Sequence, residues 1–189
     1  MNTSQPERCD QQPDLTPSLV LRLRAGENDA GIMLNELYRE AMLRFCLGYL
    51  GDPEQAEDAV QTIFYKVLHT PAVPERFRPW IYRIARNHCL NMRRDRARRK
   101  SGVDLPNESQ LHLSAIGALS RLVKHEQQAH VAHLLAALPA EFREALHLRY
   151  GENLNRSEIA EILDIPESVV KSRLYEGLKK LREHSSMLE

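Results

Sequence analysis

Apolar residues recur at helical spacing along most of the chain, and no stretch alternates in the way that a half-buried strand would. The pattern predicts an all-α protein. Its clearest part lies between residues 154 and 182, where two amphipathic helices are separated by a tight break. The apolar positions of these two helices are Ile159, Ile162, Leu163, Val170, Leu174, Leu178 and Leu181.

The residues around this break favour a helix-turn-helix. Ser157 is a candidate N-cap of the first helix, and Asp164 lies at the turn, where a small polar residue tolerates unusual backbone dihedrals. Pro166 suits the first position of the second helix. The second helix of such a motif can lie in the major groove of DNA, although similar helical hairpins also pack in bundles that bind no DNA.

The polar face of the second helix carries groups that can reach base edges and phosphates. They are Ser168, Lys171, Ser172, Tyr175 and Lys179, with Arg173 on the flank.

The first half of the chain predicts four helices. We expect residues 1–14 to be disordered, because they are polar and contain prolines. Helices follow around Leu19–Leu23, where Thr16 or Ser18 can cap and Gly26 ends the helix, and then over 29–49, 53–69 and 80–98. The loop before Trp80 contains Pro71, Pro74 and Pro79. These helices, joined by short links, predict a compact helical domain over 15–100.

The second half predicts a linker and a second small domain. Gly, Pro and capping residues indicate a flexible linker over 101–124, in which 111–123 is apolar enough for a partner-contacting helix. The second domain covers 125–189 and ends in the helix-turn-helix. Pro139 separates its first two helices, whose apolar residues are Leu134, Leu135, Leu138, Phe142, Ala145, Leu146 and Leu148.

Charge is unevenly distributed along a chain whose formal net charge is zero. Between Ile81 and Lys100, eight basic residues stand against Asp95 alone, which favours a polyanion-binding face over an ordinary solvated helix. The three cysteines are far apart and include no CxxC pair, so neither a disulfide framework nor a zinc finger is indicated. No apolar run or leader suggests a membrane span or export, and we expect a cytoplasmic protein with no membrane contact of its own.

Three segments in order resemble one known family. They are DPEQAEDAVQTIFYKVL, FRPWIYRIARNHCLNMRRDRARR and LPAEFREALHLRYGENLNRSEIAEILDIPESVVKSRLYEGLKKLR. Together they resemble the extracytoplasmic-function (ECF, group IV) sigma factors of bacterial RNA polymerase, over roughly residues 19–182. The resemblance implies region 2 over 15–100, region 4 over 125–189, and promoter-specific transcription initiation without enzymatic activity or a cofactor. It also implies three partners: core RNA polymerase, through the coiled coil of its largest subunit, promoter DNA, and an anti-sigma factor.

The resemblance assigns candidate residues to each contact. For core polymerase they are Asp58, Gln61, Thr62 and Phe64, and for the −10 element Trp80, Arg83, Arg86, Asn87, Arg93 and Arg94. For the −35 element they are Arg149, Glu167, Ser168, Val169, Lys171, Ser172, Arg173 and Lys179.

This sequence departs from the family pattern in three places. Thr62 stands where the family usually has an acidic residue, which puts one polymerase contact in question. The loop over 69–78 is a few residues shorter than usual. In the family this loop helps to hold an unstacked −10 base, so promoter preference cannot be transferred. Asp164 and Ser168 replace two common glycines around the turn.

Other interpretations of the same residues stay open at this point. Trp80 and Tyr82 could stack on an unpaired base, but a tryptophan that follows a proline at a helix start is more often part of the core. His125, His130 and His133 are near one another, but His125 is out of helical register with His130, and surface histidines on a polar helix explain the three residues better than a zinc site does. No catalytic motif is present. The alternative functions are a stand-alone helix-turn-helix transcription regulator and a protein-binding helical adaptor.

Overall fold

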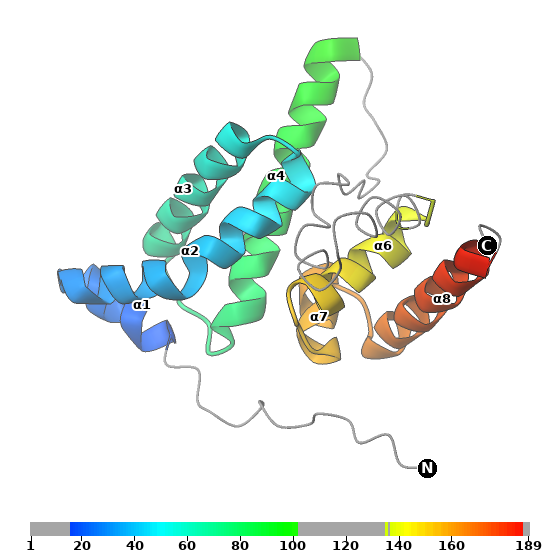
Figure 1. The fold of residues 1–189 in the computed structure, drawn as a ribbon. Helices are drawn as coiled ribbons and strands as arrows, with labels where there is room; N and C mark the ends of the chain where they lie inside the picture. Colours follow the sequence, from blue (N-terminus) through cyan, green and yellow to red (C-terminus); the bar gives the residue numbers. More distant parts are fainter. Residues whose placement is uncertain (1–15, 102–134, 136, 187–189) are drawn as a thin grey trace.

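The structure is a computed structural model that describes residues 16–101, 135 and 137–186. All regular elements within these residues are helices, which confirms the predicted all-α class. The first domain consists of α1 (Thr16–Arg24), α2 (Asn28–Leu50), α3 (Pro53–His69) and α4 (Phe77–Ser101). The second consists of α6 (Ala140–Leu146), the π-helical turn η3 (His147–Gly151), α7 (Arg156–Leu163) and α8 (Glu167–Ser186) (Figure 1).

The sequence Gly51-Asp52-Pro53 ends α2 and starts α3. Gly51 adopts φ 70°, in the left-handed region that glycine enters without steric cost, and its N–H caps the carbonyl of Leu47. Asp52 is the N-cap of α3, and its carboxylate accepts hydrogen bonds from the backbone N–H groups of Glu54 and Gln55. Those two bonds, and one from the Gln55 side chain, lower the pKa of Asp52.

Apolar stripes from α2, α3 and α4 meet in the core of the first domain. Phe45 and Tyr49 of α2 pack with Ile63 of α3 and Ile81 of α4, and all four side chains are fully buried. Phe45 makes edge-to-face contact with Tyr82 at a centroid distance of 5.2 Å. This core fixes the position of α4.

The second domain corrects one prediction about the helix-turn-helix. Asn155, not Ser157, is the N-cap of α7: its side chain accepts from the N–H of Glu158, whose carboxylate accepts from the N–H of Asn155. This reciprocal capping box satisfies two backbone donors at once, which a serine two residues later cannot do. The turn follows the sequence: Asp164 adopts φ 55° and ψ 50°, and its N–H caps the carbonyl of Ala160.

Two predicted helix boundaries also move. The fourth helix begins at Phe77, so Pro79 lies in its first turn, where a proline needs no N–H partner, and not in the preceding loop. Helix α8 begins at Glu167, one residue after Pro166, whose carbonyl accepts from Val169 and Val170. The predicted N-terminal tail, the helix over 111–123 and the start of the second domain lie outside the described residues.

The two domains pack directly against each other through α4. Figure 1 shows α4 between the other helices of the first domain and the second domain, with α7 beside its N-terminal half. Leu148 and Leu154 of the second domain belong to the same buried cluster as Phe45 and Ile81. None of the described helices is long and apolar enough to cross a membrane.

Candidate nucleic-acid interface

One side of α4, which we call the outer side, carries polar groups that solvent reaches. It consists of Trp80, Arg83, Asn87 and Arg94, which recur at helical spacing. Arg83, Asn87 and Arg94 are exposed, whereas Trp80 is half-buried. The cationic and amide groups of this side are suited to phosphates and base edges.

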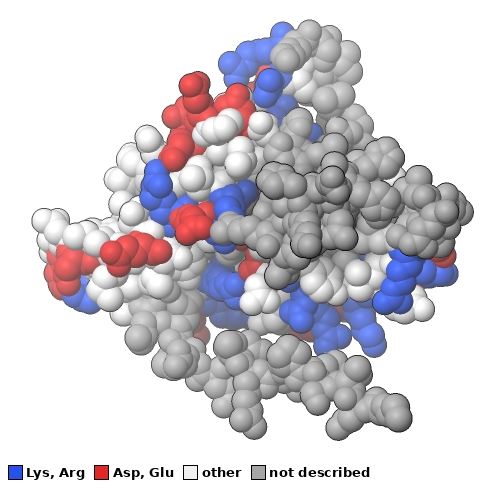
Figure 2. Space-filling model, in the orientation of Figure 1, with Lys and Arg blue, Asp and Glu red and all other residues white. Residues whose placement is uncertain are grey.

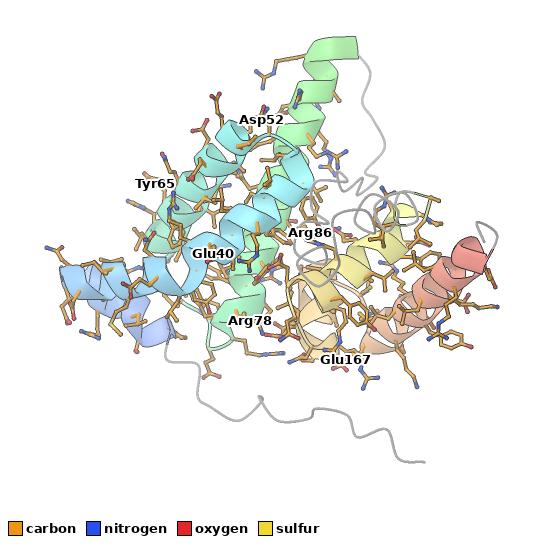
Figure 3. All side chains as sticks on the ribbon, viewed as in Figure 1. Glu40, Asp52, Tyr65, Arg78, Arg86 and Glu167 are labelled. Carbon is orange, nitrogen blue, oxygen red and sulfur yellow. The ribbon has the colours of Figure 1, made fainter. Side chains whose placement is uncertain are left out.

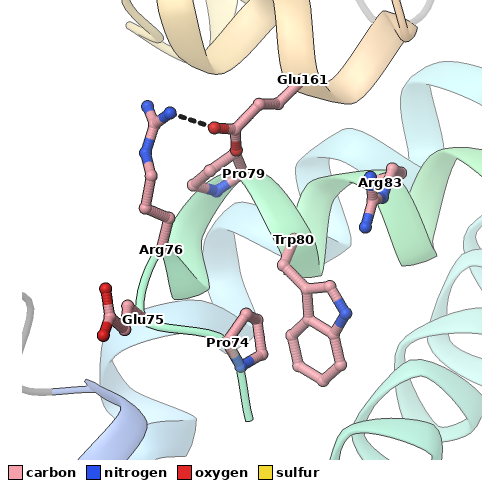
Figure 4. A pocket seen from close by; sticks show the side chains of 7 residues that line it. All are labelled: Pro74, Glu75, Arg76, Pro79, Trp80, Arg83 and Glu161. Carbon is pink, nitrogen blue, oxygen red and sulfur yellow. Dashed lines mark hydrogen bonds and ion pairs between the residues drawn. The ribbon is translucent and has the colours of Figure 1, made fainter. Parts of the chain in front are cut away.

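Trp80 combines the two roles that its sequence position suggests. Its ring packs against the core, with its centroid 5.4 Å from that of Phe77. It also lines a cavity of about 330 Å³, which is large enough for a planar base, together with Pro74, Glu75, Arg76, Pro79, Arg83 and Glu161 (Figure 4). Because Glu161 belongs to α7, the second domain contributes one wall of this cavity.

A neighbouring side of α4, the inner side, faces the second domain. It carries Arg78, Tyr82 and Arg86 at intervals of four residues, with Arg93 further along the helix. Each of the first three donates hydrogen bonds to the second domain, and Figure 3 shows Arg78 and Arg86 at the boundary between the domains. Of the residues predicted to contact the −10 element, Arg86 therefore lies at an intramolecular interface, together with Arg78 and Tyr82, which were not predicted to contact DNA.

Arg86 makes the most closely fitted of these contacts. Its Nε and Nη2 donate to the two carboxylate oxygens of Glu144 at 2.8 and 3.1 Å, and the hydroxyl of Tyr49 donates to the same carboxylate. Burial acts to lower the pKa of Arg86, but the hydrogen bond and charge of Glu144 outweigh it and raise the pKa. Burial and the neighbouring Glu144 raise the pKa of Tyr49 well above its usual value. Both partners of this bidentate pair are therefore hydrogen-bonded inside the interface.

Two further pairs continue along the inner side. The hydroxyl of Tyr82 donates to Glu152 at 2.8 Å, and Glu152 is fully buried. Arg78 lies 3.3 Å from Glu158 and also donates to the backbone carbonyl of Glu152 at 3.0 Å. A fourth pair joins Arg76, just before α4, to Glu161 of α7. We call Glu144, Glu152, Glu158 and Glu161 the carboxylate row.

A buried histidine lies beside this row. His147 stacks on Phe45 at 5.9 Å between ring centroids, and its Nε2 is 3.8 Å from Oε1 of Glu152. Burial lowers the pKa of His147 to about 4, although the charge of Glu144 opposes this. The imidazole is therefore neutral at pH 7.

The predicted polymerase-binding residues lie on a separate surface, on α3. Asp58 and Gln61 are exposed, and Thr62 is partly exposed, with its hydroxyl donating to the carbonyl of Asp58 at 3.0 Å. Phe64 packs partly against the core. In Figure 2, acidic side chains gather over the start of α3, whereas lysines and arginines gather at the far end of α4 and along α8.

The predicted −35 residues form an exposed face on α8, away from the first domain. Glu167, Ser168, Val169, Lys171, Ser172 and Lys179 are exposed, Arg173 is partly exposed, and Val170 and Leu174 of the same helix are buried. Arg149 lies apart from this face, on η3, where its guanidinium donates to the carbonyl of Leu154 at 3.0 Å. The described residues contain no cluster that could hold a metal ion, and His125, His130 and His133 lie outside them.

The carboxylates that bind the inner side of α4 were not predicted from the sequence. Arg78 and Tyr82 are related to Arg86 by steps of four residues, so their common side was visible in the sequence. The carboxylate row was not, because its members come from α6, from the residue that follows η3 and from α7, and they face α4 only after the domains pack together.

Comparisons with known proteins agree with this two-domain organisation. The Sigma-70 region 2 model matches residues 34–99, and the Sigma-70 region 4 model matches residues 134–183. The ECF RNA polymerase sigma factor SigL of Mycobacterium tuberculosis is 32% identical over 162 residues, which cover 79% of this chain and 87% of SigL.

Two solved structures share the fold. CnrH, in complex with the cytosolic domain of CnrY, matches with a TM-score of 0.65 and 21% identity, over 92% of this chain and 99% of CnrH. The sigma factor RpoE of Bartonella quintana, in complex with the anti-sigma factor NepR, matches with a TM-score of 0.56 and 22% identity, over 79% of this chain and 92% of RpoE.

Proposed function

The chain belongs to the ECF family of RNA polymerase sigma factors, and we propose that it is a group IV member that reads the −10 element with α4 and the −35 element with α8. It binds core RNA polymerase and directs transcription initiation at specific promoters. We assign residues 15–100 to polymerase and −10 binding, 101–124 to a linker and 125–189 to −35 binding, after the terminal segment 1–14. The role requires no bond chemistry and places the protein in the cytoplasm.

The observation that carries this proposal is the division of surfaces between the domains. The outer side of α4 and the polar face of α8 are both exposed and cationic, and they belong to separate helical domains. Cations on such faces neutralise phosphates and release counterions, so affinity for DNA falls steeply with salt. Amide, hydroxyl and lysine side chains on the same faces can read base edges.

The polymerase contact is proposed to lie on the exposed polar side of α3. Asp58 and Gln61 point to solvent one helical turn apart, so a partner helix can contact both. Thr62 adds a hydroxyl and no negative charge. We propose the coiled coil of the largest polymerase subunit as this partner.

An anti-sigma factor is proposed as the regulator of this chain. The Bartonella RpoE structure, which shares the fold, contains the anti-sigma factor NepR. The exposed α3 and α8 faces are the surfaces that such a partner has to cover in order to block polymerase and promoter.

Binding to core polymerase tests this function against that of a stand-alone DNA-binding regulator. Fluorescently labelled protein is titrated with core polymerase, and we expect saturable binding that Gln61→Ala weakens. Glu54→Ala, an exposed substitution in the first turn of the same helix, is the matched control. No association between the wild-type chain and core polymerase would contradict the sigma-factor role and favour the stand-alone regulator.

A further inference from the structure

We propose that Arg24, the last residue of α1, is a positioning residue for the cavity at Trp80: it ties the end of α3 to the link 70–76, which forms one side of that cavity. The inference rests on the proposed function, because it assigns to the cavity an unpaired base of the −10 strand. Helix α1 lies before residues 34–99, which the Sigma-70 region 2 model matches, so that model gives Arg24 no role.

The guanidinium of Arg24 meets three backbone carbonyls that lie 43 to 47 residues away in the chain. Its Nη2 donates to the carbonyl of Val67 at 2.8 Å and to that of Thr70, and its Nη1 donates to that of Pro71 at 3.4 Å. Val67 belongs to the last turn of α3, and the other two residues begin the link. Because a guanidinium holds its donors in a rigid planar fork, it fixes these carbonyls relative to one another.

The end of α3 depends on side chains for its capping bonds. Its C-cap, Thr70, adopts φ −74° and ψ 128°, so the chain leaves in an extended direction and not through the left-handed turn that returns N–H groups to a helix end. The last four carbonyls of a helix lack partners within it. The hydroxyl of Thr70 donates to the carbonyl of Lys66 at 2.6 Å, and Arg24 supplies the donor for that of Val67. The positive charge of Arg24 also suits the negative end of the helix dipole.

Helix α1 presents Arg24 from a packed position. Leu19 and Val20 are buried in the first domain. Leu23 packs against α2 at Gly31, where an added Cβ atom would lie 3.0 Å from Cδ1 of Leu23. The guanidinium therefore extends from a helix whose place is set by the core, and it transmits that place to the end of α3.

The link carries this restraint to the cavity at Trp80. Pro71 and Pro74 have fixed φ angles, and Val73 between them packs against the core. Pro74 lines the cavity, and Figure 4 shows it beside the indole ring, with the chain passing from it into α4. A short link that contains two prolines has few alternative conformations while both of its ends are held. Arg24 holds the end nearer α3.

The cavity shaped by this link offers the groups that bind an unpaired base. The ring of Trp80 is a stacking surface, and Arg83 on the same wall can neutralise a phosphate. A base stacked on the indole ring also meets Pro74, so a displacement of the link changes the space for that base. Loss of Arg24 leaves three carbonyls without their donor and frees the start of the link.

The proposed polymerase contact lies away from Arg24. Gln61 precedes Val67 by about 9 Å along the axis of α3, and Asp58 lies further towards its start. Both side chains are exposed, and neither is bonded to Arg24. A substitution of Arg24 should therefore affect the base cavity and leave core polymerase binding in place.

An abasic scan of the −10 strand tests the inference. Holoenzyme is assembled from core polymerase and the full-length protein and titrated with fluorescent single strands that carry the −10 sequence of a promoter it transcribes, each lacking one base. In the wild type we expect one cavity-bound position at which removal of the base weakens binding about tenfold, through lost stacking. Arg24→Ala should bind the complete strand about tenfold more weakly and lose the dependence on that base alone. The losses at the other positions and the affinity for core polymerase should stay unchanged.

Two further variants separate positioning from a general structural role. Arg24→Lys keeps a cation at the helix end but not the planar fork, and should retain part of the dependence on the cavity-bound base. Arg22→Ala, which removes ion pairs with Glu27 and Asp29 near the same helix end, is the matched control and should bind as the wild type does.

A uniform loss at all positions, or a wild-type abasic profile in Arg24→Ala, would overturn the inference. If Arg24→Ala does not fold, Arg24→Lys decides, and a wild-type profile in that variant would overturn the inference as well. Failure of the wild-type holoenzyme to bind any −10 strand would contradict the proposed function and this inference together. Normal wild-type binding with no effect of Arg24 would contradict this inference alone.

Discussion

Arg86 and Glu144 form a bidentate ion pair across the boundary between the two domains, although 58 residues separate them in the chain. The hydroxyl of Tyr49 binds the same carboxylate, so three side chains from α2, α4 and α6 meet at one buried point. This pair bears on function, because Arg86 belongs to the arginine-rich helix that the family resemblance assigns to the −10 element. In this structure the guanidinium of Arg86 binds the carboxylate of Glu144 in the second domain.

The capping box of α7 should contribute measurably to the stability of the second domain. Asn155→Ala removes the side chain that accepts from the Glu158 N–H, and we expect a loss of about 1 kcal/mol in the free energy of unfolding. Ser157→Ala, which removes only an exposed contact with Arg76, should cost less. Denaturant titrations of both variants check this, and a larger loss for Ser157→Ala would restore serine as the cap.

The outer side of α4 should contribute a phosphate contact through Arg83. Arg83→Ala should weaken promoter binding by the holoenzyme and reduce the slope of log K against log salt by about one. Arg156→Ala, an exposed arginine at the start of α7, is the control. A filter-binding titration across several salt concentrations measures the slope. An unchanged slope for Arg83→Ala would remove this residue from the interface.

Lys171 should read the −35 element without supporting the fold. Its side chain is exposed on α8, so Lys171→Ala should leave the unfolding midpoint unchanged. We expect a loss of about 1–3 kcal/mol in discrimination between the preferred −35 sequence and a mutated one. Footprinting titrations on the two duplexes give that difference. Equal discrimination by wild type and variant would show that Lys171 makes no base contact.

Protonation of His147 should destabilise the protein at acidic pH. The pKa of His147 is about 4 in the folded chain, chiefly because of burial, against a usual value near 6.5. A lowered folded pKa means that the stability contributed by the neutral ring is complete above about pH 6.5 and is lost as pH falls towards 4. At pH 5 the loss should be about 2 kcal/mol.

Several ionisable groups surround this ring, and the control has to separate their effects from its own. Glu144, Glu152 and Arg44 lie near it and carry charges that act on the ring. His147→Gln removes the imidazole alone, so its stability should depend less steeply on pH between 6.5 and 5. Denaturant unfolding at each pH compares the two proteins. Parallel curves would show that the other groups account for the whole pH dependence.

The thiols of Cys46 and Cys89 should resist modification in the folded protein. Both side chains are fully buried, and a hydrogen bond with Cys89, followed by burial, raises the pKa of Cys46 far above its usual range. The reactive species is the thiolate, so neither residue should react with an aromatic disulfide reagent. In a Cys9→Ser variant we expect no rapid reaction until denaturant is added. Prompt reaction of the native variant would show that this core opens readily.

The sequence alone predicted the helices well, because each element is determined locally. Gly51, Asp52 and Pro53 end one helix and start the next through their own dihedrals and capping bonds, and Asp164 forms the left-handed turn that a small polar residue tolerates. The error at Ser157 arose because two candidate caps lie two residues apart, and only Asn155 is placed three residues before an acidic partner.

The packing of the domains was not predictable in the same way. Periodicity shows that Arg78, Tyr82 and Arg86 share a side of α4, but it does not show what covers that side. That side is covered by carboxylates from 58 to 80 residues away in the chain, which approach α4 only in the folded protein. Tertiary contacts of this range leave no local signal.

Run-off transcription measures whether this chain directs initiation at a promoter. Core RNA polymerase is incubated with DNA from upstream of the gene that encodes this chain, with and without the purified protein. We expect a discrete transcript only when the protein is present, and weaker transcription with Arg83→Ala or Lys171→Ala. Equal transcripts with and without the protein, or full activity of both variants, would contradict the assignment of promoter reading to α4 and α8.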